Sequence, residues 1–228
     1  HPIWTPSGRI VTNDFPSNHL HHHGLWWAWT SSMFDGRKSN FWESKERQGR
    51  IECVRIEERW SGPAFGGFRA RHRFISLNAP EGPKAALDEV WELRVWAMPE
   101  GEGFLFDLVS TQTCATKEPL VIKEYRYGGL GFRGSKEWEG KTGCEFLTSE
   151  GRTRADGHTT RARWCAMTGS VDGAPATVGF LNHPANFRYP QPMRIHDTEP
   201  FFNWAAPQAG DFSIEPGTPY VSRYRFSI

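Results

Sequence analysis

The chain has 228 residues and a net charge of +1, a balance that argues against electrostatic binding to nucleic acid or to an anionic membrane surface. No apolar run approaches the roughly 18 residues needed to cross a bilayer, so no membrane partner is expected. The four cysteines form no CxxC pair, which excludes a zinc ribbon and leaves disulfide bonding open.

The sequence predicts strands along most of the chain. Ile51–Trp60 alternates apolar and polar residues, the pattern of a half-buried strand. Met98–Glu102 contains a proline and a glycine, which are typical of the turn of a β-hairpin, and it connects two long predicted strands. The predicted strands are Ile51–Trp60, Phe68–Leu77, Ala86–Ala97, Gly103–Thr113, Leu120–Tyr127, Ala162–Thr168, Ala176–Asn182, Phe201–Ala205 and Tyr220–Ile228.

The intervening segment Gly129–His158 is rich in glycine and charge, which predicts long loops. Proline or glycine interrupts each window that could form an amphipathic helix of ten residues. We therefore expect an all-β fold, a large antiparallel β-sandwich with few or no helices. It would form one domain over residues 1–228. Because the chain starts at His1-Pro2 and not at a methionine, it is expected to be trimmed, processed or a fragment; loss of an export signal stays open, as do periplasmic, secreted and cytoplasmic locations.

The first candidate site is the segment from His19 to Trp27, which holds four histidines within five residues. On an extended strand, His19, His21 and His23 would share one face and His22 would lie on the other. Neutral imidazole is both a general acid or base near neutral pH and a metal ligand. His19 and His21, with His183 as a third ligand, are therefore candidates for a divalent metal site, and no cofactor is required by any other motif.

The second candidate site is the proline-braced segment from Asn182 to His196. Its prolines restrict the backbone, so its polar side chains would be presented at low entropic cost. The candidates here are His183, Asn186, Arg188, Arg194 and His196.

Weaker candidates lie in three other segments. Trp42 and Glu43 offer an aromatic platform beside a carboxylate, and Tyr127 and Arg133 flank a glycine-rich turn. Glu89, on a long predicted strand, is either a buried functional carboxylate or an exposed one. The sequence carries 11 tryptophans, and such aromatic area with many turn residues is typical of a β protein with an aromatic-lined cleft.

Three segments together resemble a bacterial family labelled "methane oxygenase PmoA". They are His19-Leu20-His21-His22-His23-Gly24-Leu25-Trp26-Trp27, Phe41-Trp42-Glu43 and His183-Pro184-Ala185-Asn186-Phe187-Arg188-Tyr189-Pro190. The label does not fit a chain without a spanning segment. The family is instead similar to galactose-mutarotase-like β-sandwich proteins, which implies carbohydrate chemistry on a concave sheet face. Members of the family carry further strands ahead of the position of His1, so the resemblance implies that N-terminal strands of the domain are missing here. Two departures stand out: Leu20 replaces the usual proline, and the late motif has Arg194 and His196 in exchanged order.

Three functions are compatible with these observations. The first is a carbohydrate-active enzyme of epimerase, lyase or hydratase type, acting on a small-molecule or oligosaccharide substrate. In it, His21 or His22 would act with His183 as acid and base, and Arg188 and Arg133 would bind oxygens that gain charge. The remaining predicted substrate-binding residues are His19, Trp26, Trp42, Glu43, Tyr127, Asn186, Arg194 and His196. The alternatives are a non-catalytic carbohydrate-binding protein and a metal-dependent cupin-like oxygenase. The sequence leaves the oligomeric state open.

Overall fold

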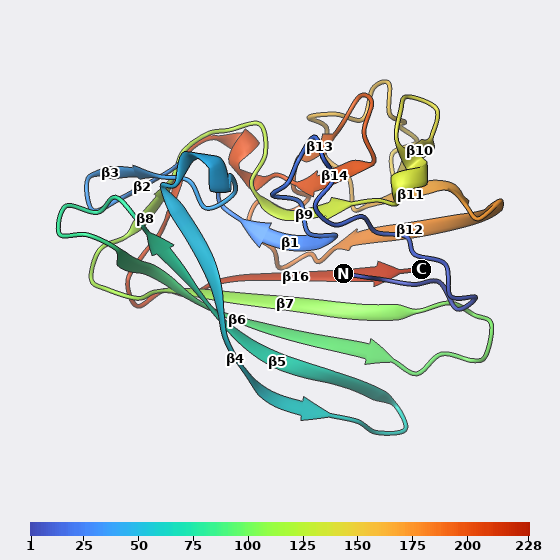
Figure 1. The fold of residues 1–228 in the computed structure, drawn as a ribbon, viewed down its shortest axis with the longest axis horizontal. Coiled ribbons are helices and arrows are strands. Elements are labelled where there is room, and N and C mark those ends of the chain that lie inside the picture. Colours follow the sequence, from blue (N-terminus) through green and yellow to red (C-terminus); the bar gives the residue numbers. More distant parts are fainter.

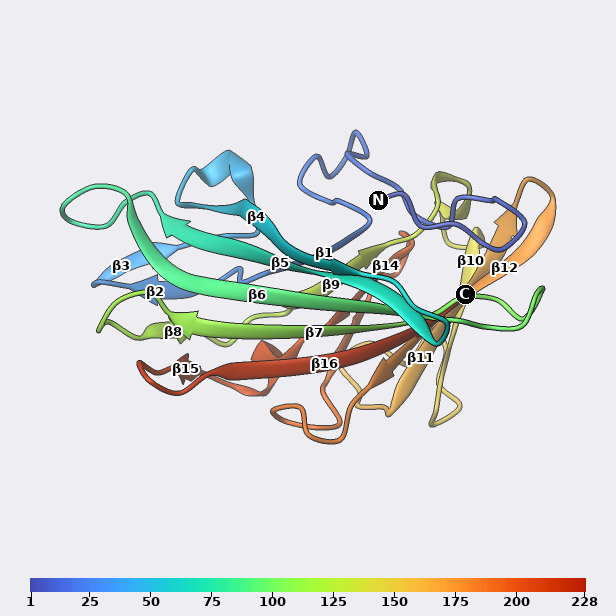
Figure 2. The ribbon, with the colours of Figure 1, turned by 90° about the horizontal axis from the view of Figure 1, so that it is seen from below.

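The computed structural model describes residues 1–228, apart from the side chain of Ser44, and the fold is all-β. One eight-stranded antiparallel sheet forms the larger layer (Figures 1 and 2). Its strands, in spatial order, are β10 (Cys144–Thr148), β11 (Trp164–Val171), β12 (Ala174–Asn182), β16 (Tyr220–Ser227), β7 (Leu105–Cys114), β6 (Lys84–Trp96), β5 (Phe65–Ser76) and β4 (Gly49–Trp60).

Two four-stranded antiparallel sheets make up the rest of the sandwich-like arrangement (Figure 1). One has the order β1 (Leu25–Ala28), β9 (Gly129–Arg133), β14 (Phe201–Trp204) and β13 (Met193–Ile195). The other has the order β15 (Phe212–Ile214), β8 (Leu120–Ile122), β2 (Ser32–Phe34) and β3 (Arg37–Ser39). Three short 3₁₀ helices lie between strands: η1 (Ser44–Glu46), η2 (Lys136–Trp138) and η3 (Ala206–Ala209).

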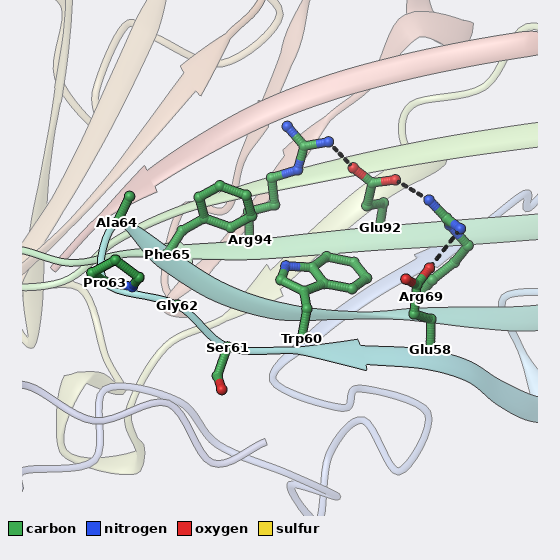
Figure 3. Close-up of a pocket in the computed structure, with 10 residues that line it drawn as sticks. All are labelled: Glu58, Trp60, Ser61, Gly62, Pro63, Ala64, Phe65, Arg69, Glu92 and Arg94. Atoms are coloured by element: carbon green, nitrogen blue, oxygen red, sulfur yellow. Dashed lines mark hydrogen bonds and ion pairs between the residues drawn. The ribbon is translucent and has the colours of Figure 1, made fainter.

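The two faces of the large sheet differ in chemistry because successive side chains on a strand point to opposite sides. On β7 the buried residues alternate with partly exposed ones, and Leu108 is fully buried. The outer face instead carries cross-strand ion pairs, such as Arg225 with Asp107 at 2.6 Å. Figure 3 shows a further chain of ion pairs on this face, from Arg94 and Glu92 of β6 through Arg69 of β5 to Glu58 of β4. The inner face is therefore the one that packs against the small sheets.

Aromatic rings fill the space between the layers. Phe180 of β12 stacks on Phe202 of β14 at 4.5 Å between ring centroids, and Trp29 and Trp204 are almost completely buried. Trp29 also donates its indole N–H to Oε1 of Gln112 at 2.8 Å, which satisfies both groups inside the core. Replacing one such ring by alanine typically costs about 3–5 kcal/mol, so much of the tryptophan content is structural.

The all-β sandwich-like prediction is confirmed, and each predicted strand overlaps an observed one. Two details need correction. The edge strand β4 is mostly exposed rather than half-buried, and the strand predicted over Leu120–Tyr127 ends at Ile122.

The prediction of long loops over Gly129–His158 is wrong for two parts of that segment. β10 lies within it, and β9 is a fully buried central strand of the second sheet. The glycines of β9 have a packing role: a Cβ at Gly131 would lie 2.8 Å from the Trp26 ring and 2.9 Å from the Trp42 ring. Glycine is thus required here by close approach of the rings, although it resembles a loop signal in the sequence.

Candidate functional site

The first candidate site is a cavity of about 300 Å³ next to the edge of the β1–β9–β14–β13 sheet. This volume lies at the lower end of the range for small-molecule sites. The predicted residues that line it are His19, His21, His22, Trp42, Glu43, Tyr127, Arg194 and His196. Asn18, Lys45, Arg126, Glu199 and Phe201 complete the wall. Residues from both predicted candidate segments therefore meet in one place.

The histidine segment forms a turn rather than the extended strand that was expected. The backbone N–H of His22 donates to the carbonyl of His19 at 2.9 Å, and this closes the turn. His22 is 3 % exposed and stacks on His19 at 4.7 Å and on Trp26 at 4.6 Å. Burial lowers the pKa of His22 far below the ordinary range, so its ring is uncharged in the folded protein. His22 and Trp26 therefore support the cavity wall as packed rings.

His19 and His21 are the more accessible imidazoles of the turn. Both are half-buried, and their rings meet edge to face at 5.5 Å. Burial lowers the pKa of each, and the negative charges of Glu199 near His19 and Glu43 near His21 partly offset this effect. Both rings are therefore neutral at pH 7, the state in which an imidazole can accept a proton.

Arg133 holds the carboxylates beneath the cavity. Its side chain is fully buried and donates from Nη1 to Glu199 at 2.6 Å and from Nη2 to Glu139 at 2.5 Å. Glu199 in turn faces Nδ1 of His19 at 3.4 Å. The expected direct role of Arg133 in substrate binding is thus corrected: with no exposed surface, it positions Glu199, and Glu199 faces the imidazole.

Glu43 and Tyr127 also line the cavity. The Tyr127 hydroxyl donates to Oε1 of Glu43 at 3.0 Å, and its ring packs against Trp42 at 5.2 Å. Burial raises the pKa of Tyr127, and the nearby carboxylate of Glu43 adds to this rise, so the phenol keeps its proton. Trp42 is itself 3 % exposed, which leaves little of its ring for stacking on a ligand in this cavity.

Two arginines supply positive charge. Arg194 on β13 is half-buried, and Arg126 is exposed with its guanidinium over the Tyr127 ring at 5.3 Å. His196 accepts hydrogen bonds at Nδ1 from the backbone N–H groups of Thr198 and Glu199, so its ring orientation is fixed by the loop that carries Glu199. An anionic or carbonyl oxygen could bind between these groups.

The structure does not bring His183 to this cavity. His183 follows β12 and lines a separate cavity with Asp107, Arg223 and Arg225. Arg225 and Asp107 form the ion pair of the outer sheet face described above. The structure therefore does not bring His183 and His21 together as the expected acid and base, because the two side chains line different cavities.

The polar side-chain atoms of Asn186 and Arg188 form hydrogen bonds with the backbone of other segments. Asn186 is 4 % exposed and exchanges hydrogen bonds with the backbone of Arg223, donating to its carbonyl and accepting from its N–H, each at 2.7 Å. Arg188 donates to the carbonyls of Ala206 and Gly210 at 2.9 and 2.7 Å. The hydrogen-bonding groups of these two side chains therefore hold neighbouring backbone in place. This explains why the segment from Asn182 to His196 is rich in polar residues without forming a site of its own.

The expected metal site does not assemble as predicted. Among the described residues, no group of three or more His, Cys, Asp or Glu side chains is arranged to hold a metal ion. The third ligand proposed for His19 and His21 was His183, which lies at the other cavity.

In the described part of the chain, no helix has the length and apolar character to cross a membrane.

Sequence reasoning missed Asn18, Lys45, Arg126, Glu199 and Phe201. Glu199 had a usable signal, because it follows His196 by three residues in a loop that ends at Pro200. Arg126 sits beside Tyr127, which was itself a candidate. Lys45 lies in η1, where nothing in the sequence pattern distinguishes it from other surface lysines.

The fold and the cavity define a sandwich-like β protein with a polar, imidazole- and carboxylate-lined site on one side of its smaller layer. The chain belongs to a family of unknown function, DUF6807, whose model matches residues 1–228. No curated protein and no solved structure matches the chain significantly.

Proposed function

We propose that this protein is a carbohydrate-active enzyme of epimerase, lyase or hydratase type, and that its substrate is an oxidised sugar, a uronate or keto-sugar. One observation carries the proposal: two half-buried neutral imidazoles, His19 and His21, share a small cavity with carboxylates and arginines. The resemblance to galactose-mutarotase-like proteins favours the same kind of chemistry, as an analogy of fold.

His21 acts as the general base. Each reaction of this group starts with removal of a proton from a carbon next to a carbonyl or carboxylate, or from water. A neutral imidazole accepts that proton, and the charge of Glu43 stabilises the imidazolium that forms. His19 is positioned in the same way by Glu199 and is the second proton carrier.

Arg194 and Arg126 bind the oxygen that gains negative charge when the proton leaves. Tyr127, whose phenol remains protonated, supplies a neutral proton donor beside Glu43. A site that combines imidazole bases with cations suits a substrate whose carbonyl or carboxylate lies next to the reacting carbon. This is why we favour an oxidised sugar over a simple aldose.

The test is a turnover screen of uronates, keto-sugars and aldoses with the parent protein and three variants, His21→Gln, His19→Gln and His183→Gln. We expect turnover of an oxidised sugar, a loss of about 100-fold or more in His21→Gln, and parent activity in His183→Gln. Full activity in both His21→Gln and His19→Gln would overturn the assignment of these residues. Tight binding of sugars without turnover would instead indicate a non-catalytic carbohydrate-binding protein.

A further inference from the structure

A second cavity, of about 550 Å³, lies between β1 and the inner face of the large sheet at β4, β5 and β6. We call it the aromatic chamber; its wall includes Trp26, Trp42, Trp91, Cys53, His72 and Glu89. His21 and Trp42 belong to its wall and also to the wall of the first cavity. The two cavities therefore adjoin at these side chains.

The chamber holds a buried carboxylate that the proposed reaction does not use. Glu89 is 1 % exposed, and its Oε1 accepts hydrogen bonds from Ser110 at 2.6 Å and Gln112 at 2.9 Å. Its Oε2 lies 3.2 Å from Nδ1 of His72. Burying a carboxylate is costly unless its acceptors are satisfied, so three partners converging on Glu89 indicate a built arrangement rather than a chance burial.

This arrangement bears on which ring nitrogen of His72 donates a hydrogen bond and which one accepts. The 3.2 Å contact between Nδ1 of His72 and Oε2 of Glu89 favours the tautomer in which Nδ1–H donates to the carboxylate, and in that tautomer Nε2 is an acceptor. The ring is held edge to face against Trp91 at 5.2 Å, and within the described part of the chain Nε2 has no hydrogen-bond partner. The partly exposed indole ring of Trp91, beside an oriented acceptor, is suited to a sugar ring, whose C–H face packs on an aromatic surface while its hydroxyl donates.

We propose that the aromatic chamber binds a second sugar ring, so that the substrate is a disaccharide-type glycoside with its oxidised ring in the first cavity. His72, oriented by Glu89, accepts a hydrogen bond from a hydroxyl of the second ring and is a positioning residue. The proposal rests on the proposed function for the identity of the first ring. The glycosidic linkage would cross the shared side chains His21 and Trp42.

Cys53 provides a direct measure of occupancy, because it is an exposed free cysteine on the chamber wall. The probes are glucuronate and a panel of glucuronosyl disaccharides. We expect a disaccharide to slow the alkylation of Cys53 by iodoacetamide, followed by peptide mass spectrometry, and glucuronate to leave the rate unchanged. By calorimetry, the disaccharide should bind at least tenfold more tightly than glucuronate.

Variants at Cys53 and at His72, each with a control, distinguish binding in the chamber from binding in the first cavity. Cys53→Tyr should remove the tenfold advantage of the disaccharide, whereas Val54→Tyr, an exposed neighbour that does not line the chamber, should keep it. His72→Ala should weaken disaccharide binding by about tenfold and leave glucuronate binding unchanged. Restoration in His72→Gln, whose side-chain carbonyl can still accept, would support the hydrogen bond.

Equal binding of the two sugars, or an advantage that survives Cys53→Tyr, overturns the chamber proposal. Absence of binding by every disaccharide also overturns it. None of these results contradicts the proposed function, which is judged separately by turnover of monosaccharides and its loss in His21→Gln. Conversely, disaccharide protection of Cys53 without turnover would support the chamber and contradict the enzyme.

Discussion

The environment of His22 leads to a sharp prediction for pH-dependent stability. Its ring stacks on His19, on Trp26 and, at 5.0 Å, on Phe201, and it is almost completely buried. In the variant His22→Phe a phenyl ring of similar shape keeps these stacks and cannot bind a proton. The comparison of parent and variant therefore isolates the titration of one imidazole.

The magnitude follows from the lowered pKa of the folded state. Below the ordinary histidine value of about 6.5 the unfolded chain binds a proton at position 22 that the folded protein refuses, so stability is complete above pH 6.5 and is lost as pH falls. The loss is about 1.4 kcal/mol per pH unit, or about 2 kcal/mol between pH 6.5 and 5.0. His19 and His21 titrate in both proteins, and their effect cancels in the difference.

Urea unfolding at pH 7.5 and at pH 5.0 measures this difference. The free energy of unfolding of His22→Phe relative to the parent should rise by about 2 kcal/mol on going to pH 5.0, which corresponds to about 4–8 °C in the midpoint of thermal unfolding. His183→Gln is the control and should lose stability as steeply as the parent, because the His183 side chain is exposed. Parallel pH profiles for His22→Phe and the parent would refute the argument.

Three further outcomes are expected. Arg133→Met should lower the free energy of unfolding by about 3 kcal/mol by urea titration, because it leaves Glu199 without its buried partner; a loss under 1 kcal/mol would contradict that role. Asn186→Ala should cost about 1–3 kcal/mol with unchanged kcat/KM, since its hydrogen bonds hold backbone away from the first cavity, and a selective loss of activity in the folded variant would disprove this placement. The kcat/KM of the parent should fall at acidic pH as His21 gains a proton, and a flat profile down to pH 4 would exclude His21 as the base.

The long strands were predictable because their signal is local. β6 and β7 show the alternation of a sheet with a buried inner face, and the hairpin chemistry between them is visible in the sequence. The central strand β9 was not predictable, because its Gly131 is needed by the rings of Trp26 and Trp42. That requirement arises from contacts with residues about 90–105 positions away, which no local window contains.

The site was predictable by residue type and only in part by position. The turn of histidines and the Arg194–His196 segment do meet, as clusters of chemically capable side chains suggested. His183 and Arg188 looked equally capable, but the assignment of a residue to one face of a sheet depends on register and on where a loop turns. The hydrogen bonds of Arg188 to backbone carbonyls show a second limit, since the same guanidinium chemistry that binds a carboxylate also holds a loop.

The four histidines of the turn differ in their chemical properties because they differ in burial and in their neighbours. His22 is sealed among aromatic rings and stays uncharged, while His23, two residues before β1, is exposed and lies 3.1 Å from the carboxylate of Asp14. His19 and His21 lie between these extremes, half-buried and each near a carboxylate. Groups that exchange protons at neutral pH need this intermediate environment, because full burial abolishes the charged form and full exposure provides no stabilising partner. The packing of His22 is therefore what places its neighbours at the correct depth, and substitutions at position 22 that remove the ring should reduce activity through His19 and His21.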